Sequence, residues 1–442
     1  MKKRLDWKRV KKILGIAAPI IGGMLSQNIF TLIDTAMIGY LGDHALAAVG
    51  ISGFLFFWGS SIYFGMNEAV QVYVARYFGA QNKQFQDIPL VIGILSVLVL
   101  GTLLAFGLWI FAPSIFALMT PNVTVQELGI SYFRWLIIGL LPMGLNFCFR
   151  SYWNGINRAN EYLLIIISTH VLNIVLNWVL IFGHLGLPKL GVAGAGIASF
   201  IAYTTASLVY FLKAKQHFPL KLFLKNCKEY ACLFRDMCRL ALPSTTRQFF
   251  FSLGLLIFYW IVGHLGYQAV AISNVLISLI LIVILPGVGF GLTAMSLVSQ
   301  AVGRKDNKDA HRWAIEVAAV AVIMTILLGS IGFLFPEHIL GIFIQNPETK
   351  QMAIAPFRLD CATIWIEVAG IVLLNALIGT GKSATVMKIS LLCQWFVFVP
   401  LGYVLGPILK LNLFWIFLAW IFYQALASIL YGLMWFKQAK KW

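Results

Sequence analysis

The chain has 442 residues, of which 60% are hydrophobic and 11% are charged. Because soluble domains carry about a quarter charged residues, this composition excludes an ordinary water-soluble protein and indicates that lipid surrounds much of the chain. The formal net charge of +17 does not indicate nucleic-acid binding, since the basic residues fall in short clusters between long apolar runs. We expect membrane lipids, and no nucleic acid, as partners.

Twelve segments are long and apolar enough to span a bilayer, which takes about 20 mostly apolar residues per helix. The sequence therefore predicts an all-α integral membrane protein with twelve transmembrane helices. The basic N-terminus runs into the first span without a small-residue cleavage site, so we interpret it as a cytoplasmic anchor and not as a signal peptide. In chain order, the predicted spans are residues 14–39, 47–75, 88–112, 129–153, 161–183, 191–212, 239–263, 271–299, 313–335, 355–379, 384–406 and 412–436.

The distribution of the basic residues predicts the orientation of the chain. With both termini in the cytoplasm, 27 of the 33 Lys and Arg residues fall on or next to the inner face and five at or near the outer face. The remaining one, Arg247, lies inside a span. Cytoplasmic loops carry such an excess of Lys and Arg. We therefore predict a multi-pass protein of the cell inner membrane with both termini inside.

The chain also contains an internal duplication, because a shift of 224 residues aligns it with itself over about 140 residues without a gap. Each copy holds six helices, an even number, so both copies enter the membrane from the same side as parallel repeats. We predict an N-lobe (1–212), a basic cytoplasmic connection (213–238) and a C-lobe (239–442), with a cleft that opens alternately to each side. The matched positions include Pro19 and Pro243, Gly39 and Gly263, Gly79 and Gly303, Arg134 and Arg358, and Gly155 and Gly379.

Three passages carry a family resemblance. They are residues 33–42 (IDTAMIGYLG), the paired helix ends 75–80 (ARYFGA) and 299–303 (SQAVG), and residues 172–177 (LNIVLN) followed by 191–196 (GVAGAG). They resemble the multidrug and toxic compound extrusion (MATE) family, and more narrowly its DinF-like branch. The resemblance covers essentially the whole chain. It implies two pseudo-symmetric six-helix bundles in a V, an ion site in the N-lobe, and a cation-coupled antiporter for amphipathic, often cationic compounds.

Asp34 is the leading candidate for the coupling residue, since it lies about 20 residues into the first span in an otherwise apolar stretch. A charge at the bilayer centre costs about 2.5–3.5 kcal/mol on insertion scales, and desolvation favours the neutral form of a carboxyl group. We predict that Asp34 accepts a proton from the outside and releases it to the inside. The alternative is a structural aspartate near the outer interface, because Gly39 and Gly42 end the helix nearby.

Asn173 and Asn177 are the next candidates, since a spacing of four residues places both amides on one helix face. In the family this face points at the aspartate of the first helix, and the second position is usually an aspartate. A single carboxylate makes a poorer cage for a hard cation than two, so Asn177 favours protons over sodium. The alternative is ordinary hydrogen bonding between helices, worth about 0.6 kcal/mol.

Other polar residues are assigned by family position or by their place in a span. Tyr132, Gln27 and Asn146 fit the N-lobe surround, where each would bond Asp34, line the cavity or simply pack. Pro19, with Gly22 and Gly23, would let the first helix bend, although the matching Pro243 equally indicates a requirement of the fold.

Several further charged residues lie within or close to the predicted spans, where charges are uncommon. Glu68 and Arg247 are predicted to line the substrate cavity, where they would form a gate, a static pair or a direct contact of Glu68 with cations. Glu367 is a possible acid site in the C-lobe, while Asp360 would pair with Arg358.

The sequence thus predicts secondary active efflux of small-molecule drugs or toxins in exchange for protons or sodium, by a protein without a cofactor that acts as a monomer. One alternative is a lipid-linked precursor flippase of the same superfamily. Such flippases tend to need a basic cavity, whereas the predicted N-lobe cavity holds an acid. The other is an integral membrane enzyme, for which no nucleophile, metal or acid–base set is visible.

Overall fold

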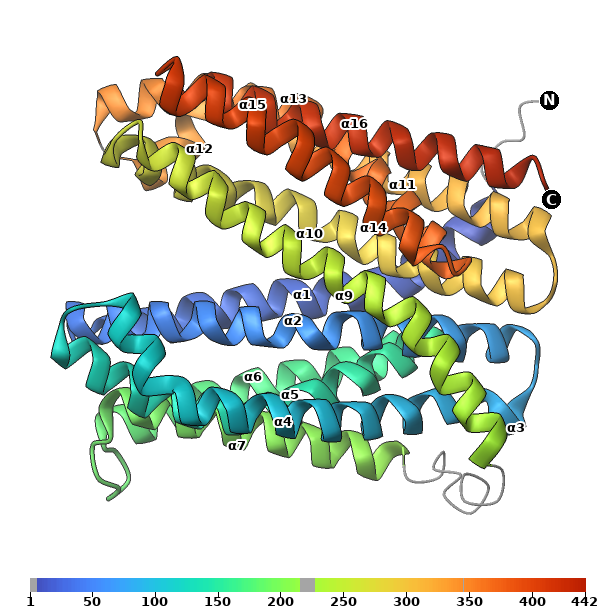
Figure 1. Cartoon of the computed structure of the whole chain (residues 1–442), viewed down its shortest axis with the longest axis horizontal. Coiled ribbons are helices and arrows are strands. Elements are labelled where there is room, and N and C mark those ends of the chain that lie inside the picture. Colours follow the sequence, from blue (N-terminus) through green and yellow to red (C-terminus); the bar gives the residue numbers. More distant parts are fainter. Residues whose placement is uncertain (1–5, 215–226, 345) are drawn as a thin grey trace. The chain divides into compact units, whose positions relative to one another are not determined.

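The computed structural model describes residues 6–214, 227–344 and 346–442, and each regular element in these ranges is helical (Figure 1). Twelve of the helices are long and apolar enough to cross a membrane, which confirms the prediction of an all-α protein with twelve spans. The helices are α1 (Trp7–Gly39), α2 (Asp43–Gly79), α3 (Lys83–Gln86), α4 (Ile88–Met119), α5 (Val123–Gly155), α6 (Ala159–Phe182), α7 (Gly191–Ala214), α9 (Cys227–Gly263), α10 (Tyr267–Gly303), α11 (Asn307–Leu334), α12 (Pro336–Phe343), α13 (Pro347–Gly379), α14 (Ser383–Leu391), the π-helical η2 (Leu392–Phe398), α15 (Val399–Tyr403), the π-helical η3 (Val404–Ile408) and α16 (Leu413–Ala439).

The helix boundaries repeat at the 224-residue offset seen in the sequence. Helices α2 and α10, and likewise α5 and α13, begin and end at matching positions. The caps repeat too: Asn122 caps α5 by accepting from the Val125 N–H, and Asn346 caps α13 by accepting from the N–H groups of Glu348 and Thr349. Such side chains satisfy the free N–H groups at a helix start. The duplication therefore preserves the local signals that begin and end each helix.

The chain divides into two compact units that do not coincide with the two halves of the sequence. The N-unit comprises Gly22–Val74 and Asn82–Thr245, and the C-unit comprises Met1–Ile21, Ala75–Gln81 and Thr246–Trp442. The divisions within α1 and α9 lie 224 residues apart. The predicted lobes, 1–212 and 239–442, share most of their residues with these units. The differences are that residues 1–21 and 75–81 belong to the C-unit and residues 239–245 belong to the N-unit.

The predicted basic connection, 213–238, is described only in part. Residues 215–226 lie outside the described part of the chain, as do the side chains of residues 227–229. From Cys227 onward the chain is already helical, because α9 begins there.

Glycines allow each exchanged helix start to pack closely within its unit. In the N-unit, a Cβ atom added at Gly65 of α2 would overlap the carbonyl oxygen of Ala241 in α9. In the C-unit, the matching Gly289 of α10 faces Ile21 of α1, whose Cγ1 would lie 2.5 Å from an added Cβ. Small residues let membrane helices approach each other closely. The two glycines therefore explain, at repeat-related positions, how α9 docks on α2 and α1 docks on α10.

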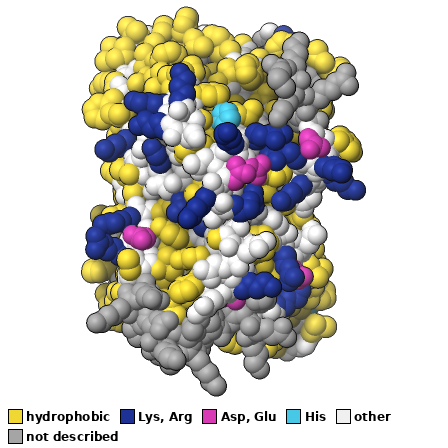
Figure 2. Space-filling model, turned by 90° about the vertical axis from the view of Figure 1, so that its right-hand side faces the viewer, with side chains coloured by type: hydrophobic (Ala, Val, Ile, Leu, Met, Phe, Trp, Pro, Cys, Tyr) yellow, Lys and Arg dark blue, Asp and Glu magenta, His cyan; other side chains and the backbone are white. Residues whose placement is uncertain are grey.

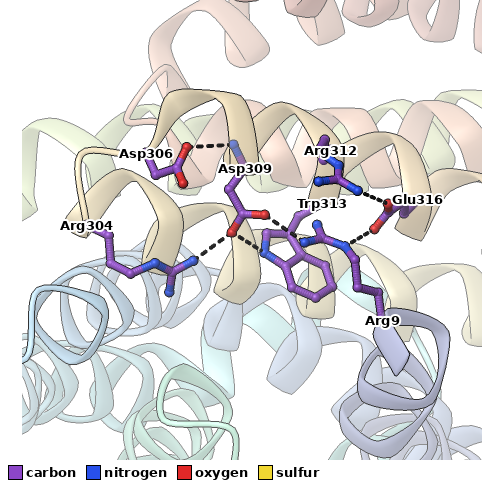
Figure 3. Close-up of polar contacts among 7 residues, drawn as sticks. All are labelled: Arg9, Arg304, Asp306, Asp309, Arg312, Trp313 and Glu316. Atoms are coloured by element: carbon purple, nitrogen blue, oxygen red, sulfur yellow. Dashed lines mark hydrogen bonds and ion pairs between the residues drawn. The ribbon is translucent and has the colours of Figure 1, made fainter. Parts of the chain in front are cut away.

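The start of α1 is also tied to α11 by a charged cluster in the C-unit (Figure 3). Arg9 pairs with Asp309 at 2.7 Å and with Glu316, and its guanidinium lies 3.4 Å from the centre of the Trp313 ring. Arg304 and the indole N–H of Trp313 both bond the other oxygen of Asp309, each at 2.8 Å. Such charge-assisted hydrogen bonds are stronger than neutral ones. The cluster holds the first turns of α1 on α11.

Basic side chains gather at the end of the molecule where α1 begins and α16 ends. Figure 2 shows this end with many Lys and Arg side chains and few Asp or Glu. The same distribution underlies the predicted orientation, since the cytoplasmic side of a membrane protein is rich in Lys and Arg. The structure describes a multi-pass membrane protein, and its orientation stays a prediction.

Candidate functional site

Asp34 belongs to a chain of polar side chains that links α1, α6 and α7 within the N-unit. Asn177 of α6 donates from Nδ2 to Asp34 Oδ1 at 2.5 Å and to Asn173 Oδ1 at 2.8 Å. Asn173 in turn donates to the hydroxyl of Ser199 on α7 at 3.3 Å. Asn177 is fully buried and Asn173 nearly so, whereas Asp34 is half-buried. The predicted meeting of Asp34, Asn173 and Asn177 is therefore present, with Asn177 as its centre.

The Asn177 amide can serve either protonation state of Asp34. Its Oδ1 is buried and has no hydrogen-bond partner among the residues that the structure describes. The two ends of an Asn amide are assigned from the hydrogen-bond network, and rotating the amide exchanges donor for acceptor. In one orientation Asn177 donates to a carboxylate, and in the other its oxygen accepts from a protonated carboxyl group. An aspartate at this position would accept but not donate when ionised.

Asp34 has no cationic partner in the described ranges 6–214, 227–344 and 346–442, where no Lys, Arg or His lies within ion-pair distance of it. Its neighbours are neutral. The hydroxyl-bearing Tyr132 of α5 and Tyr203 of α7 are close enough to interact electrostatically with it. A carboxyl group without a counter-ion inside a membrane helix is free to change its charge, since it is not committed to a salt bridge.

Tyr132 lies near Asp34 mainly as a packing residue. Only 4% of it is exposed, and it belongs to a buried apolar cluster with Ile38 of α1 and Ile181 of α6. A Cβ atom added at Gly196 of α7 would lie 3.0 Å from the Tyr132 carbonyl oxygen, so this glycine lets α7 approach α5. The cluster fixes the C-terminal end of α1 close to Asp34. No hydrogen bond joins the described side chains of Tyr132 and Asp34.

Gln27 and Asn146 bond groups other than Asp34. Asn146 of α5 donates to the carbonyl oxygen of Tyr203 at 3.0 Å and accepts from Ser207 at 2.8 Å. Gln27 Oε1 lies 3.1 Å from His170 Nε2. Among the described residues neither amide has a hydrogen bond to Asp34, and their predicted place in the cavity stays a prediction.

His170 is a polar member of this α1–α6 contact that the sequence did not single out. Its Nδ1 lies 2.7 Å from the Ser26 hydroxyl, and its ring stacks on Phe30 with centroids 4.9 Å apart. The usable signal was its spacing: His170 precedes Asn173 by three residues and Asn177 by seven, so all three share one face of α6.

The C-unit contains a separate pair of acids on α13. Glu367 accepts a 2.6 Å hydrogen bond from the side-chain amide of Gln424 on α16. Asp360 is 6% exposed, and its Oδ2 has no hydrogen-bond partner in the described part of the chain. The predicted pair of Asp360 with Arg358 is wrong, because residues two apart on a helix point to different faces. Asp360 is instead a second buried acid, two helical turns from Glu367.

A comparison with models of protein families shows to which family the chain belongs. A model of the MatE family matches the chain twice, over residues 19–179 and 243–404. The two matches begin at Pro19 and Pro243, at the repeat offset of 224 residues. The chain belongs to the MatE family. The predicted MATE resemblance is thereby confirmed, and this MatE protein is a membrane transporter and not an enzyme.

Relatives of this MatE protein share its full length at low identity. A probable multidrug resistance protein NorM from Oceanobacillus iheyensis is 26% identical over 410 residues, which cover 90% of each chain. The probable multidrug resistance protein YoeA of Bacillus subtilis is 26% identical over 456 residues, covering 98% of this chain and 95% of the relative. The multidrug resistance protein PmpM of Pseudomonas aeruginosa is 24% identical over 407 residues, covering 90% and 84%. None of these names singles out the DinF-like branch, which stays a prediction.

Solved structures show the same fold. One is an outward-facing multidrug resistance MATE family transporter of the MOP superfamily, with a TM-score of 0.90, 22% identity and coverage of 98% of this chain and 96% of that one. Another is a MOP superfamily transporter from Pyrococcus furiosus, with a TM-score of 0.88, 22% identity and coverage of 97% and 96%. At this identity the likeness establishes the twelve-helix MATE architecture.

The remaining residues predicted for the cavity and for the bend of α1 lie in different compact units of the MatE protein. Glu68, partly buried, lies on α2 in the N-unit, while Arg247, also partly buried, lies on α9 in the C-unit, so their predicted gate stays a prediction. Pro19 lies inside α1 three residues before the division between the units. Gly23 lies just after it, where an added Cβ would be 2.5 Å from the ring of Tyr162.

Proposed function

We propose that this MatE transporter exports amphipathic, often cationic small molecules in exchange for protons, with Asp34 as the group that carries the proton. The substrate class is supported by its relatives, which are named as multidrug resistance proteins. The observation that carries the coupling proposal is the bond between Asp34 and Asn177, at a site where no described cation neutralises the carboxylate.

The proposed cycle uses the two protonation states of Asp34. A proton from the outside neutralises the carboxyl group, and the Asn177 amide, which can donate or accept, keeps a hydrogen bond to it in both states. Release of the proton to the inside restores the carboxylate for the next exchange. Bending of α1 at Pro19 and Gly23 would couple this change to access from the two sides of the membrane, since proline removes one backbone hydrogen bond of the helix.

Protons are favoured over sodium by the residues around Asp34. A hard cation prefers several charged oxygen ligands, and here one carboxylate is accompanied by two neutral amides, Asn173 and Asn177. The proposal places the protein in the cell inner membrane with both termini in the cytoplasm. Gln27, Asn146, Glu68 and Arg247 remain proposed cavity residues, and Glu367 a proposed second acid site.

The proposal is tested by transport into inverted membrane vesicles. A fluorescent amphipathic cation should accumulate when a proton gradient is imposed, and Asp34→Asn should reduce this accumulation by at least tenfold, because an amide cannot carry the proton. The control is Asp43→Asn, which alters an exposed acid in the first turn of α2 and should leave transport unchanged. Unaltered proton-driven transport by Asp34→Asn would remove Asp34 from the coupling role. If neither a proton nor a sodium gradient moves any amphipathic cation, the exchange mechanism itself fails.

A further inference from the structure

His170 is bonded at both ring nitrogens by consecutive residues of α1. Ser26 Oγ lies 2.7 Å from Nδ1 and Gln27 Oε1 lies 3.1 Å from Nε2, while Phe30, one turn further along α1, stacks on the ring with 3° between the planes. His170 is 5% exposed. The imidazole is therefore enclosed by the same helix that carries Asp34.

These partners accommodate both charge states of the imidazole. The neutral ring donates from Nε2 to the Gln27 oxygen and accepts at Nδ1 from the Ser26 hydroxyl. The protonated ring donates from both nitrogens, and it still finds two acceptors, because a hydroxyl oxygen and an amide oxygen both accept hydrogen bonds. A histidine held by a backbone N–H would lose that bond on protonation. The Ser26–Gln27 pair instead keeps both hydrogen bonds when the ring is protonated.

Among the residues that the structure describes, no charged side chain pairs with His170, so a proton on the ring is held only by its two hydrogen bonds. On α1 the nearest carboxyl group along the helix is Asp34, seven residues beyond Gln27 and hence about 10 Å away along the axis. In the described chain no charged side chain lies within ion-pair distance of His170. The titratable groups of the helices around it are Lys8, Arg9, Lys11, Lys12 and Asp34 on α1; Glu161 and Tyr162 on α6; Glu127, Tyr132, Arg134, Cys148, Arg150 and Tyr152 on α5; and Tyr203, Tyr210 and Lys213 on α7.

We propose that His170 is a second proton-carrying residue of the N-unit, loaded and unloaded through the movement of α1. Displacement of Ser26 and Gln27 exposes both nitrogens, so that a proton passes between Nδ1 or Nε2 and water. Return of α1 encloses the ring with its charge state fixed. This inference rests on proton-coupled exchange at Asp34 and adds a second proton to it, at a position two helical turns along α6 from Asn177.

The test measures how many protons move with each substrate molecule. Purified protein in liposomes is given opposing gradients of protons and of a fluorescent organic cation. The proton gradient that just stops the net movement of the cation gives the number of protons exchanged for each cation. Wild type should exchange two protons for one substrate, and His170→Gln should exchange one, because glutamine bonds Ser26 and Gln27 but does not titrate. His170→Gln should also change the pH dependence of transport, because glutamine does not titrate.

Controls separate this role from a structural one. His184→Gln changes a histidine that stacks on Trp178 just after α6 and should keep the wild-type stoichiometry and pH profile. His170→Asn, a shorter amide, provides a second variant if His170→Gln does not insert, and it should give the same loss of one proton. A wild-type stoichiometry and pH profile in either recovered variant overturns the inference while leaving Asp34 in its role.

A binding measurement covers the case in which neither variant can be recovered. Solubilised Asp34→Asn should still release protons when a substrate cation is added, because His170 is intact. Absence of any proton release from that variant overturns the inference. If wild type is driven by neither gradient, the proposed exchange has failed as well, and the two failures are thereby distinguished.

Discussion

At the scale of single residues, the identity of position 177 decides which ion suits the site. Asn177 presents a neutral amide to Asp34 and Asn173, so one negative charge is available. Replacing this amide by a carboxylate places two acids side by side, and two like charges at close range favour binding of a cation between them. Aspartate is thus the obvious substitution to make at this position.

We predict that Asn177→Asp makes transport sodium-dependent. Exchange driven by a sodium gradient should rise by about tenfold, which corresponds to about 1.4 kcal/mol of added ion binding. Sodium-driven and proton-driven uptake into inverted vesicles measures both effects, with Asn173→Asp as a comparison at the adjacent position. Unchanged dependence on the two ions in Asn177→Asp would show that this amide does not select the ion.

At the scale of helices, the feature that connects the two compact units is that α1 and α9 each begin in one unit and continue in the other. Two interactions anchor these helix starts. Arg9 binds Asp309 and Glu316 of α11 (Figure 3), and glycines at the matching positions 65 and 289 admit the incoming helices. The parts of α1 that carry Asp34 and His170's partners lie beyond the division, in the N-unit. Movement of α1 therefore acts on the polar site directly.

We predict that Gly65→Ala destabilises the protein by about 1–3 kcal/mol, the usual cost of overpacking. The added methyl group would overlap the Ala241 carbonyl oxygen, and backbone cannot move aside as a flexible side chain can. Thermal unfolding of the solubilised protein measures the loss. The matched control is Gly107→Ala in α4, where an added Cβ meets nothing within 4 Å, and it should be neutral or stabilising by about 0.5–1 kcal/mol. Equal melting temperatures for both variants would contradict the close approach of α9 to α2.

At the scale of the whole molecule, the gathering of basic side chains at one end (Figure 2) is the basis for its orientation in the membrane. We predict that Lys440→Cys, near the end of α16, reacts with an impermeant thiol reagent only after the membrane is opened, in a background lacking the native cysteines. Ser131→Cys, an exposed position near the start of α5, should react in intact cells. The reverse pattern would place the basic end outside.

The sequence by itself determined the number of helices, the duplication and the class of protein. These properties can be read from single segments or from the comparison of the two halves of the sequence. An apolar segment long enough to span a bilayer becomes a helix without a tertiary partner, because a helix satisfies its own backbone hydrogen bonds in lipid. Asp34 and the shared face of Asn173 and Asn177 were also readable, because an acid in an apolar span and a spacing of four residues carry their own physical meaning. The Asp360–Arg358 pair failed, since adjacency in sequence did not account for helical geometry.

Only the tertiary structure decided which side chains meet across helices and which helix starts are exchanged. His170 was hidden because its meaning depends on Ser26 and Gln27, which lie over 140 residues away in the chain. The glycines at 65 and 289 were likewise unremarkable until the backbone of another helix was placed against them. A sequence specifies each helix through its own composition, whereas the hydrogen bonds between helices depend on rotation and depth that only packing fixes.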